Sequence, residues 1–203
     1  MKNVLLVGAG NLGRRHLQSL RNSRYPIRIF VVEPFDEARS LAKTAFDQAA
    51  SSQPEKAVSF HRSLDDIDQK IDIVIDATPA TGRLDVLKRT LDLGAKDLVL
   101  EKVAFNSVND IDQAVALIEQ NAARAWVNCP RRLNPFYIQL RTVLEKESID
   151  RFEVVGENFG MACNAIHFID LFSFLAGRHA YGITLAEVQN IASSKLDIIT
   201  TFA

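Results

Sequence analysis

Apolar runs alternate with segments of helical period along the chain from Asn3 to about Asn128. Several of the runs are apolar throughout, as strands must be when helices cover both of their faces. The segments between them place apolar residues on one side of a helix. This alternation, without internal repeats, predicts a parallel sheet whose strands are joined by helices. The predicted strands are Val4–Val7, Ile27–Val32, Val58–Phe60, Ile71–Asp76, Leu98–Leu100 and Ala125–Asn128.

Residue types between the strands predict where the helices begin and end. One helix spans about Asp36–Phe46, before a stretch rich in Ser, Gln and Pro. A second begins near Leu84, and Gly94 is placed as its C-terminal cap. A third, amphipathic helix begins at Asn109 or Asp110. These elements predict a doubly wound α/β domain of the Rossmann type.

The pattern changes after Asn128. Two prolines precede a helical stretch, which is typical of a crossing between domains. A strand at Phe152–Glu157 and an apolar helix closed by Gly177 come next, before strands at Glu187–Ile191 and Leu196–Phe202. Because the last strand is apolar and ends the chain, we expect its edge to lack a pairing strand.

Length and charge narrow the choice of partner. The 203 residues, 47% of them hydrophobic, are enough for one full core and part of a second. We therefore expect one domain over residues 1–128 and a partial α+β domain over residues 129–203. Lys and Arg number 24 against 25 Asp and Glu, so no basic field attracts nucleic acid or a membrane surface. The expected partner is a small molecule.

The cysteines and the start of the chain bear on location. Cys129 and Cys163 are too few and too far apart for a disulfide framework or a zinc cluster, which indicates a reducing compartment. No apolar signal region opens the chain, and no apolar run is long enough to span a membrane. We expect a cytoplasmic protein. Trp126 and the phenylalanines of the apolar helix are expected in the core.

Three glycines follow the first predicted strand directly. Gly8, Gly10 and Gly13, with Asn11 and Leu12 between them, fit the pattern G-x-G-x-x-G at the start of a helix. Such a loop lets a dinucleotide pyrophosphate approach the backbone and meet the N–H groups of the helix. The alternative is a glycine-rich tight turn without a ligand.

An acidic residue strengthens the first of these interpretations. Glu33 ends the second predicted strand 20 residues after Gly13. A carboxylate at this position can accept hydrogen bonds from both ribose hydroxyls of the adenosine half of a dinucleotide. Because a carboxylate repels a 2′-phosphate, NAD is favoured over NADP, although Arg14 or Arg15 could blur that choice. The alternative is a surface acid at a strand end.

Two further stretches follow the fourth and fifth predicted strands, "DATPATGR" and "LEKVAFNS". The carboxyl ends of parallel strands face the ligand crevice. Glu101 and Lys102 could form a solvated pair there, but an ammonium beside a nicotinamide can also orient a substrate hydroxyl for hydride loss. The cofactor-binding candidates at this edge are Thr78, Pro79, Glu101 and Lys102.

The sequence resembles the glucose-fructose oxidoreductase / inositol dehydrogenase / MocA family of NAD(P)-dependent oxidoreductases. The resemblance rests on five motifs in order, "VGAGNLGRRH", "DIVIDATPATGR", "GAKDLVLEKVAFNS", "VNCPRRLNPF" and "NAIHFIDLFSFLAG", and covers essentially the whole chain. It implies a second domain with a mostly antiparallel sheet that floors the substrate pocket and often builds a dimer. We therefore expect a homo-oligomer and a shortened C-terminal domain.

The resemblance also implies roles for individual residues. Lys102 matches the lysine of a Glu-Lys-Pro signature that contacts the nicotinamide ribose and the substrate hydroxyl. His167 matches the general acid/base of the family; the alternative is a histidine satisfied in the core. Asn164 is expected to hydrogen-bond a sugar hydroxyl, because Cys163 stands where the family has an aspartate. Independently of the resemblance, the basic cluster "PRRLNP" is expected to be solvated; the alternative is that Arg131 or Arg132 lies near the crevice and meets an acidic group of the substrate.

The sequence departs from the family pattern at two further positions, and two functions are compatible with it. Val103 replaces the proline of Glu-Lys-Pro, and Arg83 stands where many members have a histidine. The first function is hydride transfer between NAD and a hydroxyl-bearing carbon of a sugar, cyclitol or sugar-nucleotide. The alternative is an NAD-binding sensor or scaffold that has lost catalysis. A short-chain epimerase is disfavoured, because no tyrosine has a lysine four residues after it.

Overall fold

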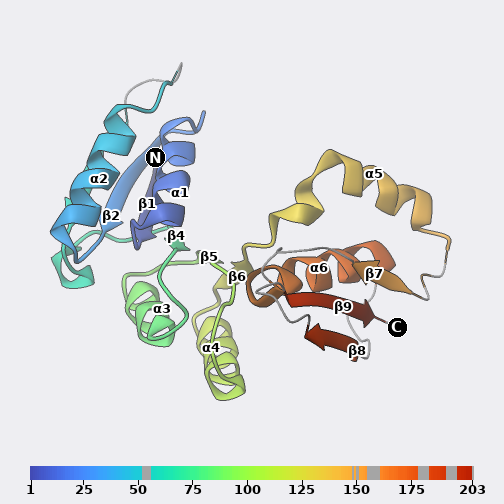
Figure 1. The fold of residues 1–203 in the computed structure, drawn as a ribbon. Helices are drawn as coiled ribbons and strands as arrows, with labels where there is room; N and C mark the ends of the chain where they lie inside the picture. Colours follow the sequence, from blue (N-terminus) through green and yellow to red (C-terminus); the bar gives the residue numbers. More distant parts are fainter. Residues whose placement is uncertain are drawn as a thin grey trace. The chain divides into compact units, whose positions relative to one another are not determined.

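The computed structural model describes residues 1–51, 56–147, 149, 151–154, 161–177, 183–190 and 196–202. The chain forms two compact units, Met1–Asn128 and Cys129–Ala203 (Figure 1). Among the described residues, no helix has the length and apolar character needed to cross a membrane.

The first unit contains a six-stranded sheet with the order β3-β2-β1-β4-β5-β6. Every pair of neighbours in it is parallel. This order, with the crossover between β3 and β4, is that of a Rossmann fold, so the predicted fold class is confirmed. The strands are β1 Lys2–Val7, β2 Ile27–Val32, β3 Val58–His61, β4 Ile73–Asp76, β5 Asp97–Leu100 and β6 Arg124–Val127.

Helices on both faces explain why the strands are apolar. On one face, Leu6 and Ile29 of the sheet share a core with Leu17 of α1. On the other face, Leu98 shares a core with Leu87 of α3. This core also includes Ala114 of α4, Leu5 and Val74. The helices are α1 Asn11–Arg21, α2 Asp36–Asp47, α3 Arg83–Asp92 and α4 Val108–Gln120, with a short 3₁₀ helix η1 at Leu64–Asp66.

Several local predictions in this unit differ from the structure. Strand β4 begins at Ile73, two residues after its predicted start, and β6 spans Arg124–Val127, one residue earlier than predicted. Helix α4 begins at Val108, not at Asn109 or Asp110, because the Ser107 side chain caps it by accepting the Asp110 N–H. Trp126 lies outside the core, with half of its side chain exposed. Trp126 lies on the edge strand β6, where it pairs with Val99 of β5. Its side chain is on the face of the sheet opposite α3 and α4, so neither of these helices covers it.

The second unit combines helices with a three-stranded antiparallel sheet of order β7-β9-β8, as predicted. The last strand lies in the middle of this sheet. The expectation that its edge lacks a pairing strand was therefore wrong, since β7 and β8 both pair with it. The elements are η2 Pro130–Leu133, α5 Pro135–Leu144, β7 Phe152–Val154, α6 Met161–Ala176, β8 Ile183–Asn190 and β9 Leu196–Phe202.

The ends of several elements differ from those predicted in this unit. Strand β7 ends at Val154, and residues 155–157 of the predicted strand lie outside the described residues. Strand β8 begins at Ile183, four residues before the predicted start. Gly177 ends α6 with a φ of 65°, a left-handed conformation that glycine adopts at low cost.

Candidate functional site

A groove of about 540 Å³ lies at the carboxyl ends of the strands of the first unit. Its volume falls in the range of about 300–1,000 Å³ that is usual for small-molecule sites. Parallel strands bring their carboxyl ends to one edge, so segments far apart in the sequence meet there. The groove is lined by the glycine loop, by Glu33 to Phe35 after β2, by Ala77 to Pro79 after β4, and by Glu101 and Lys102 after β5.

The three glycines of the loop, Gly8, Gly10 and Gly13, are needed for different structural reasons. Gly8 has a φ of 84°, which L side chains rarely adopt. A Cβ at Gly13 would lie 2.0 Å from the Gly8 carbonyl oxygen, so this glycine allows α1 to pack against the loop. A Cβ at Gly10 would meet nothing within 4 Å and would lie at the groove itself. Gly8 and Gly13 shape the loop, and Gly10 leaves space for a ligand.

The N-terminus of α1 can attract an anion at this place. Gly10 caps the helix without a side-chain hydrogen bond, and the first turn carries no acidic residue. The first N–H groups of a helix have no partner inside it, and the helix dipole is positive at this end. Asn11 and Leu12 line the groove from this turn. The arrangement fits a diphosphate with respect to both shape and charge.

Glu33 lies beside the glycine loop and is only 5% exposed. Its Oε2 accepts the Ala9 N–H at 2.8 Å, and its Oε1 accepts the Phe35 N–H at 3.1 Å. These bonds hold the carboxylate at the groove and leave part of its acceptor capacity, since a carboxylate has about four acceptor positions. Phe35, 73% exposed, adds a flat apolar ring to the same end of the groove.

Thr78 and Pro79 form the opposite side of the groove, on the loop after β4. The Thr78 N–H and hydroxyl both donate to Asp76 Oδ1, at 3.0 and 2.5 Å. Burial raises the pKa of Asp76, and the bonds from Thr78 and the charge of Arg83 oppose that rise only in part. The buried end of β4 thus fixes the backbone that carries Thr78.

Glu101 is held by two residues whose role the sequence analysis missed. His16 Nε2 lies 2.7 Å from Glu101 Oε1, and Asn128 Nδ2 donates to the same oxygen at 2.6 Å. Burial alone would raise the pKa of Glu101, but the hydrogen bonds from His16 and Asn128 outweigh it, so this pKa lies below its ordinary value. His16 follows buried Gly13 by three residues on the same face of α1, but this spacing does not indicate that Glu101 is its partner.

The predicted substrate residues lie in the second unit, on α6 and η2. Asn164 and His167 are three residues apart and half-buried, so they share a face of α6 with Asp170. Arg132 Nε donates to Asp170 Oδ2 at 2.8 Å, and a second nitrogen of its guanidinium pairs with Oδ1. Arg132 therefore already has a carboxylate partner. The side chain of Cys163 lies outside the described residues.

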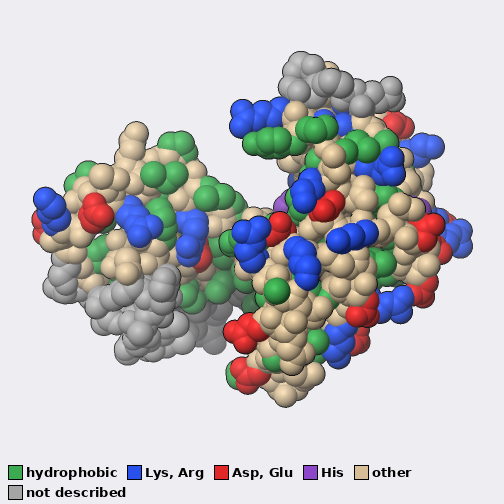
Figure 2. All heavy atoms as spheres, turned by 180° about the vertical axis from the view of Figure 1, so that it is seen from behind, with side chains coloured by type: hydrophobic (Ala, Val, Ile, Leu, Met, Phe, Trp, Pro, Cys, Tyr) green, Lys and Arg blue, Asp and Glu red, His purple; other side chains and the backbone are tan. Residues whose placement is uncertain are grey.

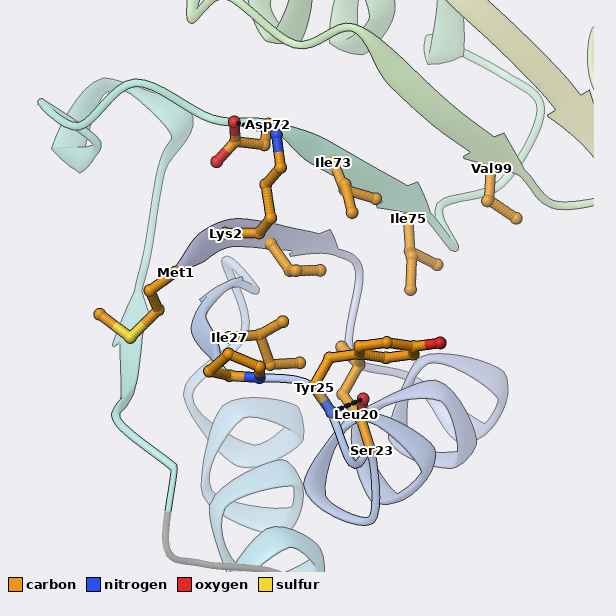
Figure 3. A pocket seen from close by; sticks show the side chains of 12 residues that line it. Met1, Lys2, Leu20, Ser23, Tyr25, Ile27, Asp72, Ile73, Ile75 and Val99 are labelled. Atoms are coloured by element: carbon orange, nitrogen blue, oxygen red, sulfur yellow. Dashed lines mark hydrogen bonds and ion pairs between the residues drawn. The ribbon is translucent and has the colours of Figure 1, made fainter.

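A second hollow, of about 480 Å³, has a different character (Figure 3). It opens near the amino ends of β1, β2 and β4, and apolar side chains such as Ile27, Ile73 and Ile75 line most of it. The charged groups at its rim, Lys2 and Asp72, form an ion pair at 3.0 Å. Among the residues that the structure describes, neither a glycine loop nor a helix N-terminus lines it, in contrast to the first groove.

Charged side chains of both signs occur on the surface of the protein. On the face that Figure 2 shows, basic and acidic side chains lie among one another. In the part of the chain that the structure describes, no group of three or more His, Cys, Asp and Glu side chains could hold a metal ion.

Comparisons with known proteins identify the family and the cofactor of the first unit. A family model described as an oxidoreductase family with an NAD-binding Rossmann fold matches residues 2–129. The uncharacterized oxidoreductase YrbE of Bacillus subtilis is 25% identical over 145 residues, which cover 71% of this chain and 40% of that protein. The family match confirms the prediction of NAD as the cofactor.

Solved structures show the same fold. The scyllo-inositol dehydrogenase of Lactobacillus casei, with bound NAD(H) and scyllo-inositol, matches with a TM-score of 0.74 at 18% identity, over 96% of this chain and 61% of that one. The myo-inositol dehydrogenase of the same organism, with NAD(H) and myo-inositol, has a TM-score of 0.75 at 18% identity, over 99% and 64%. The chain thus spans less than two thirds of the length of these relatives.

Proposed function

Because the chain belongs to the glucose-fructose oxidoreductase / inositol dehydrogenase / MocA family of NAD-binding oxidoreductases, we propose that it oxidises or reduces a sugar-like substrate. The reacting group is a hydroxyl-bearing carbon of a sugar, cyclitol or sugar-nucleotide. NAD supplies the hydride chemistry. Two structural relatives were crystallised with an inositol and NAD(H), which supports this class of substrate.

The single observation that carries the proposal is the composition of the groove. One cavity of about 540 Å³ is lined by Gly10, Glu33 and Lys102. The carboxylate of Glu33 suits the ribose of the adenosine, and the N-terminus of α1 suits the pyrophosphate. The nicotinamide end then falls beside Thr78 and Lys102. One groove thus offers partners for the ribose, the pyrophosphate and the nicotinamide end of a dinucleotide, which supports the proposal.

Two residues move or hold the proton of the substrate hydroxyl in this proposal. Lys102, half-buried at the edge of the groove, orients the hydroxyl and stabilises negative charge on its oxygen. His167 accepts the hydroxyl proton during oxidation and returns it during reduction, since an imidazole exchanges protons near neutral pH. Asn164, one helical turn before His167, binds a neighbouring hydroxyl.

Binding and turnover measured on the same preparations test the proposal. NADH is titrated first, and NADH formation is then followed with a panel of cyclitols, sugars and sugar acids. We expect His167→Ala to lower kcat by about 10²–10⁴-fold while the Kd for NADH stays within about twofold. Lys102→Ala should lower kcat and also weaken NADH binding, because this lysine contacts both ligands in the proposal.

A matched control separates these effects from a general loss of charge. Lys43→Ala, on the exposed side of α2, should change neither binding nor turnover. Turnover that survives both Lys102→Ala and His167→Ala would contradict the proposed roles. The alternative is an NAD-binding sensor, which the replacement of the signature proline by Val103 favours. NADH binding without turnover of any member of the panel would support this alternative.

A further inference from the structure

Arg83 is a fully buried arginine at the first position of α3, with 1% of its side chain exposed. The preceding residue, Gly82, has a φ of 80°, and this left-handed turn begins the helix. A buried guanidinium is costly unless it is paired and hydrogen-bonded, so its partners explain why it is there.

The partners of Arg83 belong to two different loops. One terminal nitrogen donates to the Glu101 carbonyl, and to those of Val103 and Ala104 at 2.8 and 3.0 Å. The other terminal nitrogen donates to the Thr78 carbonyl. One side chain thus ties the loop after β4 to the loop after β5.

The bonds of Arg83 surround the position of Lys102. The bonded carbonyls belong to the residue before Lys102 and to the two residues after it. Arg83 Nε lies 3.6 Å from Asp76 Oδ1, the oxygen that also accepts both donors of Thr78. Arg83 therefore anchors both loops at the nicotinamide end of the groove to the buried end of β4.

We propose that Arg83 is a positioning residue that holds Lys102 and Thr78 in place at the NAD groove. The role requires arginine, because a planar guanidinium with five donors can reach several carbonyls at once, whereas lysine presents a single ammonium. The role also explains how the loop is restrained although Val103 stands in place of the signature proline. A proline would restrict the loop through its own ring. Here the side chain of Arg83, on α3, restrains it instead. The inference rests on the proposed contact of Lys102 with the cofactor.

The first test replaces Arg83 without removing its charge. Arg83→Lys keeps a cation near Asp76 but cannot bridge the two loops. We expect amide hydrogen exchange to accelerate at least about tenfold from Lys102 to Asn106, while β1 and β2 keep their protection. The Kd for NADH should rise about tenfold. Arg89→Lys is the matched control, since Arg89 lies on the same helix in an exposed pair with Asp65, and it should change neither quantity.

The outcomes separate a positioning role from a merely structural one. A purely structural arginine would accelerate exchange throughout the unit or leave the Kd for NADH unchanged in the folded variant, and either result would overturn the inference. If Arg83→Lys does not fold, Arg83→Met with Asp76→Asn removes both buried charges together and is measured in the same way. If Lys102→Ala leaves NADH binding unchanged, the proposed role of Lys102 fails, and the exchange from Lys102 to Asn106 still decides whether Arg83 holds the loop.

Discussion

The glycine loop, Gly8–Gly13, and the lysine loop, Glu101–Ala104, lie at the same edge of one sheet, yet different parts of the chain hold them. Backbone geometry shapes the glycine loop, because a Cβ at Gly13 would collide with the carbonyl of Gly8. The lysine loop is held by side chains from elsewhere, chiefly Arg83 on α3 and His16 on α1. The glycine loop is therefore sensitive to added atoms as well as to the loss of Glu33, whereas the lysine loop is sensitive chiefly to the loss of side chains on α1 and α3.

The largest effect that sharpens this comparison is expected at Glu33, which binds the glycine loop through Ala9. Glu33→Gln keeps one acceptor but loses the charge and the second acceptor. We expect the Kd for NADH to rise by about 10–100-fold, as is usual when a hydrogen bond to a charged group is lost. The preference for NADH over NADPH should shrink, because the repulsion of a 2′-phosphate disappears.

The matched control is Glu37→Gln, on the exposed first turn of α2. It should change the Kd of neither dinucleotide. An unchanged Kd for NADH in Glu33→Gln would contradict the proposed contact of this carboxylate with the ribose.

A smaller effect is expected behind the lysine loop, at Glu101. Its pKa is below the ordinary value in the folded protein, so its contribution to stability is present above about pH 4.5 and is lost as the pH falls through the folded-state pKa. Glu101→Gln cannot make this contribution. The difference in unfolding free energy between parent and variant should therefore shrink as the pH falls below about 4.5.

Urea denaturation at a series of pH values measures this difference. Glu119→Gln, on the exposed side of α4, is the control and should follow the parent at every pH. A difference for Glu101→Gln that stays constant with pH would mean that the bonds from His16 and Asn128 do not favour the ionised carboxylate.

The same contrast explains how much could be predicted from the sequence. The alternation of strands and helices and the candidate positions Gly8, Gly10 and Glu33 follow from local spacing, which a pattern records directly. The contacts of His16 and Asn128 with Glu101 join residues 85 and 27 positions apart. Spacing along the chain does not encode which distant side chains will meet, so these contacts were missed.

Two wrong predictions have related causes. Trp126 was expected in the core because of its size, but its strand is at the edge of the sheet and the residue faces away from α3 and α4. The last strand was expected to lack a neighbour because the chain ends there, although β7, far earlier in the sequence, pairs with it. In both cases tertiary arrangement decided the burial or pairing that local sequence could not.

The affinity of Gly10→Ala for NADH tests the central claim most directly, namely that the bare glycine loop receives the diphosphate of NAD. Gly10 has a φ of −63°, and its Cβ would meet no protein atom within 4 Å, so the variant should fold with unchanged or slightly higher stability. Gly13→Ala is the contrast, since overpacking against Gly8 should cost about 3 kcal/mol of unfolding free energy. We predict that Gly10→Ala weakens NADH binding at least about tenfold while remaining fully folded. Unchanged NADH affinity in this folded variant would contradict the account.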